Sequence, residues 1–457
     1  MLACSMDDHL KYLYGLQRFG IAPGLAVMEQ MMDALGHPEQ RFRSVHVTGT
    51  NGKGSTCAMI ASILRTAGYR TALYTSPHLY TFNERIQVGG VPISDDELTS
   101  LVKEIREVVI QHDIYPTFFE FTTALAFLYF ARSGIDIAII EVGMGGAWDA
   151  TNVIIPMLSV ITNVGLDHME FLGTTKQAIA QEKAGIIKEG VPVVTREEDP
   201  AILQIFEDVA QTKHTRVIRA QDVVDTKILS ADLGGQKVEI GLIERTNPLQ
   251  LPLRKGEGAT PYSPPYEGGV RGGSSLYCIH LPLLGAHQVK NLETVLVAIP
   301  LLTKEGLGEV RREAISAGIA KVRWEGRMQV VSKSPLIIVD GAHNADGAHV
   351  LADFLQTIPS CDILIFAAKK RKDISDMLEY VMPRFRKIIV TQGEYMPEDS
   401  SVLAAQIRAV HQDVEIQNDV GQAVARGIEL AGRNGVIVIA GSLYMIPRAL
   451  SYIRQAL

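Results

Sequence analysis

A glycine-rich loop with a single lysine is the clearest chemical feature of the sequence. It runs Thr48-Gly49-Thr50-Asn51-Gly52-Lys53-Gly54-Ser55, after a short apolar run and before a helical pattern. Glycines allow backbone N–H groups to turn toward one point, and the N-terminus of the following helix adds positive partial charge. Lys53 would then reach the β- and γ-phosphates of a nucleotide. The candidate phosphate ligands are Thr50, Asn51, Gly52, Lys53, Gly54 and Ser55.

The loop departs from the strict GxxxxGK[ST] pattern of phosphate-binding loops. Val47 stands where the first glycine belongs, and Gly54 follows the lysine. A glycine-rich turn without a ligand is therefore an alternative. The apolar strand before the loop and the glycines on both sides of Lys53 favour phosphate binding.

Polar residues follow or end several other apolar runs. Ser76 comes after residues 71–75, Glu141 ends residues 135–141, and His168 follows residues 158–162. The carboxyl ends of parallel strands converge on one crevice, so we expect these side chains to lie close together. Taken alone, Glu141 is either a Mg²⁺ ligand or a helix-capping group.

Two of the candidate residues have patterns that by themselves favour an ordinary structural role. His168 is more typical of a loop histidine than of a ligand. Lys183 lies on an amphipathic helix and is more typical of a solvated surface lysine.

The apolar pattern predicts an α/β protein with two domains. Fully apolar strands that alternate with helices indicate a mainly parallel sheet covered on both faces. We expect residues 1–320 to form a P-loop-type ATPase domain with a small β-rich part, and residues 321–457 a smaller Rossmann-like domain. Predicted strands are 45–48, 71–75, 135–141, 158–162, 336–340, 363–367, 387–391 and 436–440; predicted helices are 55–67, 94–112, 345–357 and 420–431.

One segment has a different composition from the rest of the chain. Residues 254–275 are crowded with glycine, proline and serine. Such a segment has too little apolar surface to offset the entropy of ordering, so we predict a disordered insertion. A proline-rich segment that binds a partner is the alternative.

Composition disfavours some classes of function. The 457 residues include 44 basic and 51 acidic side chains, for a net charge of -7, which disfavours a nucleic-acid or anionic-membrane binder. The 4 cysteines form no CxxC pair, which disfavours a zinc ribbon and fits a reduced, cytoplasmic compartment. No apolar run approaches the roughly 18 residues of a membrane span, and the N-terminus shows no signal-peptide pattern.

The phosphate loop and a series of further motifs together resemble the folylpolyglutamate synthase/dihydrofolate synthase family of the Mur ligase superfamily. The resemblance covers nearly the whole chain, and each motif alone is weak. The matching segments, in one order, are residues 12–21, 48–55, 75–79, 82–86, 141–146, 149–152, 165–168, 182–186, 287–291, 326–327, 340–344 and 441–444.

The resemblance implies a metal site. In similar proteins the positions of Ser76 and Glu141 bind one Mg²⁺, and those of Glu141 and His168 help to hold a second. Lys183 would carry a CO₂-derived carbamate. Carbamylation converts a cation into a carboxylate-like oxygen ligand, which a hard cation accepts.

The resemblance also implies the substrate ligands. Asn291 would contact adenine and Arg327 a phosphate, since the planar fork of arginine pairs two oxygens at once. Asp340 would lie near the ribose or the incoming glutamate, with His343 and Ser442 in the glutamate pocket. Residues 77–86 and 115–120 would line the folate site; the candidates there are Arg85, as a cation that anchors the substrate, and Phe119. For Asp340 and Asn344, a strand-to-helix turn is the structural alternative.

The implied reaction is ATP-dependent amide bond formation between L-glutamate and dihydropteroate, a folate, or both. Lys53, His168, Lys183, Arg327 and His343 are the candidate catalytic residues, with His343 as a possible base. ATP, two Mg²⁺ ions and K⁺ are the expected cofactors, and we expect a monomer without nucleic-acid or membrane partners.

Three departures from the family pattern qualify this expectation. Ala147 and Trp148 replace the usual Arg-Leu, residues 367–373 differ from the usual Gly-Ala-x-Lys-Asp-Lys-Asp, and residues 254–275 are inserted. A small-molecule kinase with a P-loop is one alternative. A nucleotide-binding family member with impaired catalysis is another.

Overall fold

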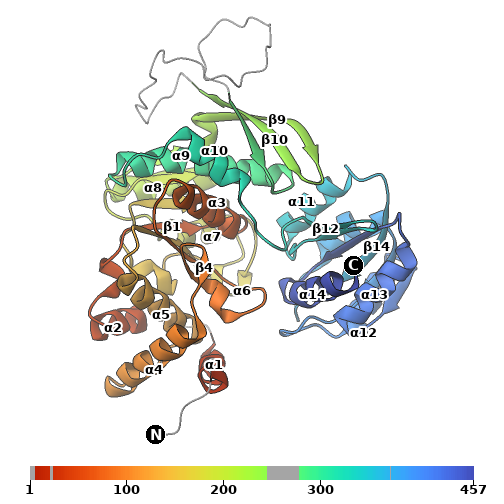
Figure 1. Ribbon diagram of the computed structural model, residues 1–457, viewed down its shortest axis with the longest axis horizontal. Coiled ribbons are helices and arrows are strands. Elements are labelled where there is room, and N and C mark those ends of the chain that lie inside the picture. The colour runs from red at the N-terminus through yellow and green to blue at the C-terminus, as the bar shows by residue number, and fades with distance from the viewer. Residues whose placement is uncertain (1–5, 21–23, 244–276, 371) are drawn as a thin grey trace, which may run out of the picture.

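The protein forms two α/β domains, seen in a computed structural model that describes residues 6–20, 24–243, 277–370 and 372–457 (Figure 1). The N-terminal domain carries an eight-stranded sheet and a three-stranded sheet, and the C-terminal domain carries a six-stranded sheet. The predicted insertion at 254–275 lies outside the described residues. The two-domain α/β architecture that the sequence predicts is confirmed.

The large N-terminal sheet has the strand order β4-β3-β2-β5-β1-β6-β7-β8. The six strands from β2 to β8 pair in parallel, while β3 and β4 are antiparallel. The strands are β1 (Ser44–Thr48), β2 (Thr71–Tyr74), β3 (Ile86–Val88), β4 (Val91–Pro92), β5 (Ile137–Glu141), β6 (Leu158–Ile161), β7 (Val193–Thr195) and β8 (Val217–Arg219).

The sheet is mainly parallel, as predicted, but its antiparallel edge was not itself predicted. Gly89 and Gly90 join β3 to β4 with φ angles of 63° and 83°. These left-handed conformations are the ones that a two-residue hairpin turn requires. The chain therefore reverses at once instead of crossing over through a helix.

Helices cover both faces of the large sheet, as predicted. Along β5, Ile137 and Ile139 belong to the core beneath α3, α9 and α10, whereas Ala138 and Ile140 belong to the core beneath α4 and α5. This alternation follows from the two-residue period of a strand. The helices of this domain are α1 (Met6–Gly15), α2 (Ala26–Ala34), α3 (Lys53–Thr66), α4 (Asp95–Gln111), α5 (Phe118–Arg132), α6 (Met169–Leu172), α7 (Lys176–Ala184), α8 (Pro200–Thr212), α9 (Ala286–Lys304) and α10 (Arg312–Ala320).

Side-chain caps fix the start of several helices. The predicted capping box at α4 is present, since Ser94 and Glu97 each bond the backbone N–H of the other. Thr117 and Glu120 form a second box at α5. Such caps satisfy N–H groups that a helix leaves without partners.

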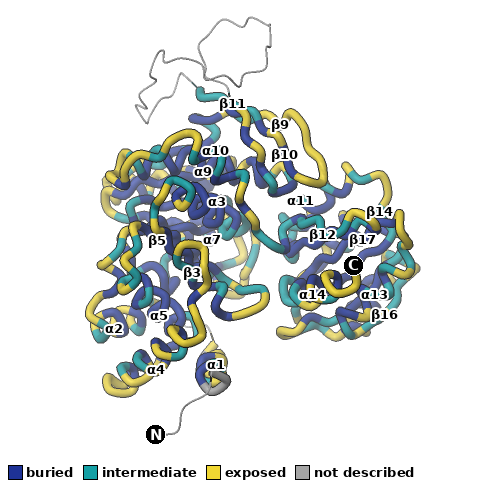
Figure 2. The backbone as a smooth tube through the Cα atoms, viewed as in Figure 1, coloured by how far each residue is buried: buried dark blue, intermediate teal, exposed yellow. Residues whose placement is uncertain are grey.

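A small antiparallel sheet lies next to α9 and α10 in this domain (Figure 1). It consists of β9 (Val224–Asp232), β10 (Gly235–Leu242) and β11 (Tyr277–Leu281), in the order β11-β10-β9. Most of β9 is exposed (Figure 2). This sheet is the β-rich part that the sequence predicts.

The C-terminal sheet has the order β12-β13-β17-β14-β15-β16, parallel except for β12. Its helices are α11 (Ala345–Leu355), α12 (Ser400–Arg408), α13 (Val420–Ala431) and α14 (Ile446–Ala456). The first two cover one face and the last two the other. The strands are β12 (Gln329–Lys333), β13 (Leu336–Val339), β14 (Cys361–Phe366), β15 (Phe385–Val390), β16 (Val414–Ile416) and β17 (Val436–Ala440).

One connection, between α10 and β12, leads from the N-terminal to the C-terminal domain. Glu325 on this connection accepts hydrogen bonds from the Tyr80 hydroxyl at 2.7 Å and from Arg454 at 2.6 Å. Tyr80 belongs to the N-terminal domain and Arg454 to α14, so the connection is held by both domains.

Candidate active site

A cavity of about 420 Å³ lies between the two domains and collects most of the predicted site residues. Its walls are loops that follow β1, β2, β5 and β6 of one domain and β13 of the other, together with parts of α7 and α9. The predicted residues that line it are Thr50, Asn51, Gly52, Lys53, Gly54, Ser55, Ser76, Glu141, His168, Lys183, Asn291, Arg327, Asp340 and His343. The expected convergence of strand ends is therefore confirmed.

The glycine-rich loop is held in place by its neighbour after β6. The Thr50 N–H donates to the Asn163 carbonyl at 3.0 Å, and the Asn51 N–H donates to the Asn163 side chain at 2.9 Å. The Lys53 ammonium folds back on the loop and donates to Gly49 O at 2.7 Å and Thr50 O at 3.1 Å. The loop is thus preformed, with its cation at its centre.

Gly52 is required by both conformation and space. Its φ is 82°, and a Cβ there would lie 2.4 Å from Asn291 Oδ1. The loop therefore packs directly against Asn291 of α9. This contact brings the residue expected to bind adenine beside the phosphate loop.

Glu141 is a buried carboxylate that caps no described helix, so the capping alternative is wrong. Its Oε2 accepts the Ser76 N–H at 3.0 Å, which joins the ends of β5 and β2. Burial raises the pKa of Glu141, while the charges of Lys53 and Arg327 oppose that rise.

Lys183 is almost fully buried, at 2% exposure, so the surface lysine suggested by the helical pattern is wrong. Among the described residues, its ammonium has no hydrogen-bond or ion-pair partner. Burial, followed by the nearby charge of Lys53, holds the pKa of Lys183 well below its usual value. Burial therefore raises the share of the neutral amine.

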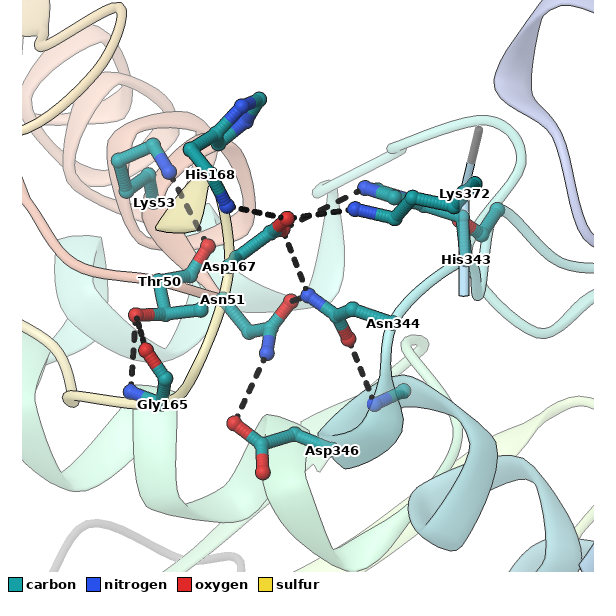
Figure 3. Close-up of polar contacts among 12 residues, drawn as sticks. Thr50, Asn51, Lys53, Gly165, Asp167, His168, His343, Asn344, Asp346 and Lys372 are labelled. Atoms are coloured by element: carbon teal, nitrogen blue, oxygen red, sulfur yellow. Dashed lines mark hydrogen bonds and ion pairs between the residues drawn. The ribbon is translucent and has the colours of Figure 1, made fainter. Parts of the chain in front are cut away.

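Asp167 joins the two domains in the network that Figure 3 shows. It accepts hydrogen bonds from Lys372 at 2.5 Å and from Asn344 at 2.9 Å, and Asn344 also donates to Asn51 of the phosphate loop at 3.2 Å. Burial raises the pKa of Asp167, but the charges of His168 and Lys372 outweigh burial and hold it below its usual range. Sequence reasoning quoted Asp167 only within a motif, although a carboxylate just past a strand was a usable signal.

Arg327 lies on the connection but is held by the C-terminal domain. A Cβ on Gly341 would lie 2.2 Å from Arg327 Nη1, so the guanidinium rests on that glycine.

Asp340 accepts the N–H groups of Met328 and Ala342, both at 2.7 Å. Asp340 thus stabilises a turn and also lines the cavity, and Asn344 caps α11 by accepting the Gly347 N–H. Asp340 and Asn344 therefore do stabilise the strand-to-helix turn that was their structural alternative.

His343 points one ring nitrogen at its own backbone and the other toward Asp167. Nδ1 lies 2.7 Å from Gly341 O, and Nε2 lies 3.8 Å from Asp167 Oδ2. Burial lowers the pKa of His343 to about 4. The imidazole is therefore neutral at neutral pH, with Nε2 as its free acceptor.

Three predicted residues, Arg85, Phe119 and Ser442, are not among the described residues that line this cavity. Arg85 is buried, donates to His78 Nδ1 at 2.8 Å, and lies 5.4 Å from the ring centroid of Phe118. The Phe119 ring packs on Gly143, which does line the cavity. The Ser442 hydroxyl accepts the Tyr444 N–H at 3.3 Å.

His287 is a lining residue that sequence reasoning quoted in a motif but did not select. Burial lowers its pKa to about 4, and its buried Nδ1 has no hydrogen-bond partner among the described residues. Its neighbour Gln288 bonds Asn291 at 3.1 Å and Ser55 at 3.3 Å. The start of α9 thus positions Asn291.

Comparisons with known proteins decide the family. A family model described as Mur ligase middle domain matches residues 47–253, and one described as Mur ligase, glutamate ligase domain matches residues 326–443. A dihydrofolate synthase/folylpolyglutamate synthase of Bacillus subtilis is 36% identical over 452 residues, which cover 96% of this chain and 97% of the relative. The chain belongs to the folylpolyglutamate synthase/dihydrofolate synthase family of Mur ligases.

Solved structures of this family share the fold. The folylpolyglutamate synthase of Thermotoga maritima superimposes with a TM-score of 0.80 at 30% identity, over 99% of this chain and 97% of that chain. The Mycobacterium tuberculosis folylpolyglutamate synthase complexed with ADP and AMPPCP has a TM-score of 0.82 at 28% identity, over 98% of this chain and 99% of that chain.

Ala147 lies beside Glu182, and one carboxylate oxygen of Glu182 has no hydrogen-bond partner among the described residues. The Ala147 N–H donates to the Glu182 carbonyl at 2.8 Å, and the buried Glu182 Oε2 has no hydrogen-bond partner in the described part of the chain. Burial raises the pKa of Glu182. The backbone here is tightly packed, since a Cβ on Gly185 would lie 2.4 Å from Ala147.

The expected Mg²⁺ ions have few protein donors in the described part of the chain. Across residues 6–20, 24–243, 277–370 and 372–457, no three His, Cys, Asp or Glu side chains gather to hold a metal. Glu141 is a single buried carboxylate with Ser76 beside it and the phosphate loop across the cavity. Mg²⁺ characteristically takes one or two carboxylates plus substrate phosphates, so the donors fit that ion.

Proposed function

We propose that the chain catalyses ATP-dependent formation of an amide bond between L-glutamate and a dihydropteroate or folyl substrate. The observation that supports the proposal is that one cavity is lined by residues of both domains. It brings Lys53, Glu141 and Lys183 of one domain together with Arg327 and His343 of the other. Both halves of the site are needed for a reaction that first transfers a phosphoryl group and then joins an amine.

The reaction has two balanced steps. A carboxylate oxygen of the folyl substrate attacks the γ-phosphorus of ATP, and the bond to the β-phosphate oxygen breaks, giving an acyl phosphate and ADP. The glutamate amine then attacks the acyl carbon, loses a proton, and inorganic phosphate leaves. Phosphoryl transfer depends on positioning and charge neutralisation, which Lys53 and Arg327 supply.

His343 is the proposed acceptor of the amine proton. Its neutral ring has Nε2 free at neutral pH, whereas a protonated ring would have no acceptor. The low pKa makes it a weak base, so proton transfer accompanies attack rather than preceding it.

Ser76, Glu141 and His168 would hold Mg²⁺, with Lys183 completing the donor set as its carbamate. Bound there, Mg²⁺ would neutralise negative charge on the phosphates. The buried, unpaired Lys183 amine supports carbamylation, because CO₂ reacts with the neutral amine. An intact mass of native protein without the additional CO₂, together with density for a bare lysine, would remove the carbamate from the proposal. K⁺ is also a proposed cofactor, and no residue of the chain is assigned to bind it.

The other candidate residues would take the roles that the family resemblance implies. Asn291 would contact adenine, Asp340 the ribose or glutamate, and Ser442 the glutamate pocket. Arg85 and Phe119 would line the folate site.

We also propose a domain boundary at 320/321, a monomeric state and a cytoplasmic location. No helix within the described ranges is long and apolar enough to cross a bilayer.

The test is ADP release with Mg-ATP and glutamate, with dihydropteroate or a reduced folate supplied in parallel. Turnover with both acceptors would identify a bifunctional synthase, and turnover with one would assign the branch. ADP release that does not depend on glutamate would favour a kinase. ATP binding without turnover would favour impaired catalysis and direct attention to Ala147.

A further inference from the structure

Lys369 lies in a fixed position just beyond the end of β14. It pairs with Pro397 in an isolated antiparallel bridge, and the next N–H, of Lys370, donates to Met396 O at 2.8 Å. Its ammonium lies 5.2 Å from the ring centroid of Tyr395 and 5.5 Å from that of Tyr444. The two ring centroids are 4.9 Å apart, so the aromatic pair positions one cation.

This cation has no carboxylate partner among the described residues. Its neighbour Lys372 is paired with Asp167, and no ion pair joins Lys369 itself to an acid. Asp167 and Glu170 act on it only at longer range, and burial lowers its pKa. Aromatic faces attract an ammonium but do not neutralise it, so the residue retains capacity for an anion.

Lys369 lies at the same edge of the sheet as part of the site already described, although Lys369, Tyr395 and Tyr444 are not among the residues that line its cavity. β14 lies between β17 and β15 in the sheet, and Lys369, Tyr444 and Tyr395 follow these three strands. The carboxyl ends of neighbouring parallel strands form the usual ligand crevice. The same edge carries Asp340 and His343 after β13, and both line the cavity.

Tyr444 also lies within electrostatic reach of Arg85, which comes from the N-terminal domain. The aromatic pair therefore stands where the two domains meet on the proposed folate side.

The proposed reaction requires such a cation. Glutamate enters with two carboxylates, and its amine must stay free to attack. Lys53 and Arg327 are assigned to phosphates, Lys183 to the metal site, and Lys372 to Asp167. Lys369 has no such assignment and no carboxylate partner among the described residues, so it can accept a carboxylate.

We propose that Lys369 binds a carboxylate of the incoming glutamate, with the rings of Tyr395 and Tyr444 positioning its ammonium. This assignment rests on the proposed function. It makes Lys369 a specificity-determining residue contributed by the segment that departs from the family pattern, residues 367–373.

The test compares Lys369→Met with Lys370→Met in the full chain. Both variants remove one positive charge from adjacent positions, but Lys370 is exposed and lies outside the aromatic pair. ADP release is measured against glutamate, ATP and folyl diglutamate concentration. We expect Lys369→Met to raise the glutamate KM at least about tenfold with little change in the ATP or folyl KM, as loss of a charged hydrogen bond predicts.

A variant that keeps the charge distinguishes binding of glutamate by Lys369 from a purely structural role of Lys369 in its loop. Lys369→Arg keeps the charge and should keep the glutamate KM within about threefold of wild type. A glutamate KM equal in the two methionine variants would overturn the assignment. A rise in the folyl diglutamate KM instead would also overturn it, because the carboxylate would then belong to the tail of the acceptor. If the wild type releases no ADP in response to glutamate, the proposed function fails and the assignment fails with it.

Discussion

Asp167 and Lys372 lie 205 residues apart in the chain and form an ion pair across the two domains, with Nζ 2.5 Å from Oδ1. Their side chains are 9% and 25% exposed, so solvent screens the pair only partly. Asn344 extends the contact to Asn51 of the phosphate loop. The position of one domain is thus coupled to the loop of the other.

Asp167→Asn should reduce activity more than stability. The change leaves the Lys372 ammonium without its anion but removes no apolar core, since Asp167 lies between the domains. A hydrogen bond to a charged group contributes about 1.5–3 kcal/mol, so kcat/KM should fall roughly tenfold to a hundredfold. Steady-state ADP release and the thermal midpoint measure the two effects. Asp413→Asn is the control, because it weakens a pair within one domain, with Lys387 at 2.8 Å. Equal losses of activity in both variants would contradict the coupling.

Gly52→Ala should weaken ATP binding through its contact with Asn291. Gly68→Ala is the matched control, since Gly68 also has a positive φ of 97° but nothing within 4 Å of a built Cβ. Both changes place alanine in a left-handed conformation that costs about 1–2 kcal/mol. Only Gly52→Ala should raise the ATP dissociation constant, by at least about tenfold, in isothermal titration calorimetry. Similar ATP affinities for the two variants would show that the contact with Asn291 does not matter.

Lys183→Met should abolish turnover without destabilising the fold. Methionine is of similar length and removes a buried amine that lacks a partner, so the thermal midpoint should stay level or rise. Glutamate-dependent ADP release should fall by at least about a hundredfold, as for a group acting in the transition state. Lys176→Met, on the exposed start of the same helix, is the control. A markedly lower midpoint for Lys183→Met would indicate that the lysine supports the fold.

His46 should make the protein sensitive to acid. It is fully buried, its Nε2 lies 2.8 Å from Thr151 Oγ1, and burial lowers its pKa to about 3 from a usual 6.5. Between these values the unfolded chain binds the proton and the folded chain does not, so stability falls as pH decreases through this window. At pH 5 this histidine alone should cost about 2 kcal/mol relative to neutral pH.

Urea unfolding of His46→Gln at pH 7 and pH 5 measures this contribution. The free energy of unfolding should drop by about 2 kcal/mol less in the variant than in the wild type. His214→Gln, whose side chain is 82% exposed, should keep the wild-type dependence. An unchanged acid dependence in His46→Gln would exclude this histidine as the cause.

Local patterns were sufficient for most of the fold. The apolar run that ends at Glu141 is β5, and Ser94 begins α4 through the predicted box. The hairpin at Gly89 and Gly90 was missed because its strands are only 3 and 2 residues long, too short to show a period. The glycine pair itself was the usable signal.

Side chains whose environment is tertiary were predicted less well. Helical spacing places Lys183 on the surface, and only the resemblance indicated otherwise. The partner of Asp167 comes from a segment 205 residues away, which no local pattern links to it. The position of Lys369 depends likewise on two rings from segments that follow other strands.

The attachment of Arg327 has a thermodynamic consequence. Gly341 N–H donates to Gly326 O at 2.8 Å, so this arginine is carried by the C-terminal domain, while Lys53 is carried by the N-terminal one. A nucleotide that contacted both residues would bind more tightly when the domains are closed than when they are apart. The coupling between the two equilibria is reciprocal. If ATP shifts the protein toward the closed form by a given factor, closure strengthens ATP binding by the same factor. The ATP dissociation constant and the ratio of closed to open protein would therefore change together, so a measurement of either one reports on the other.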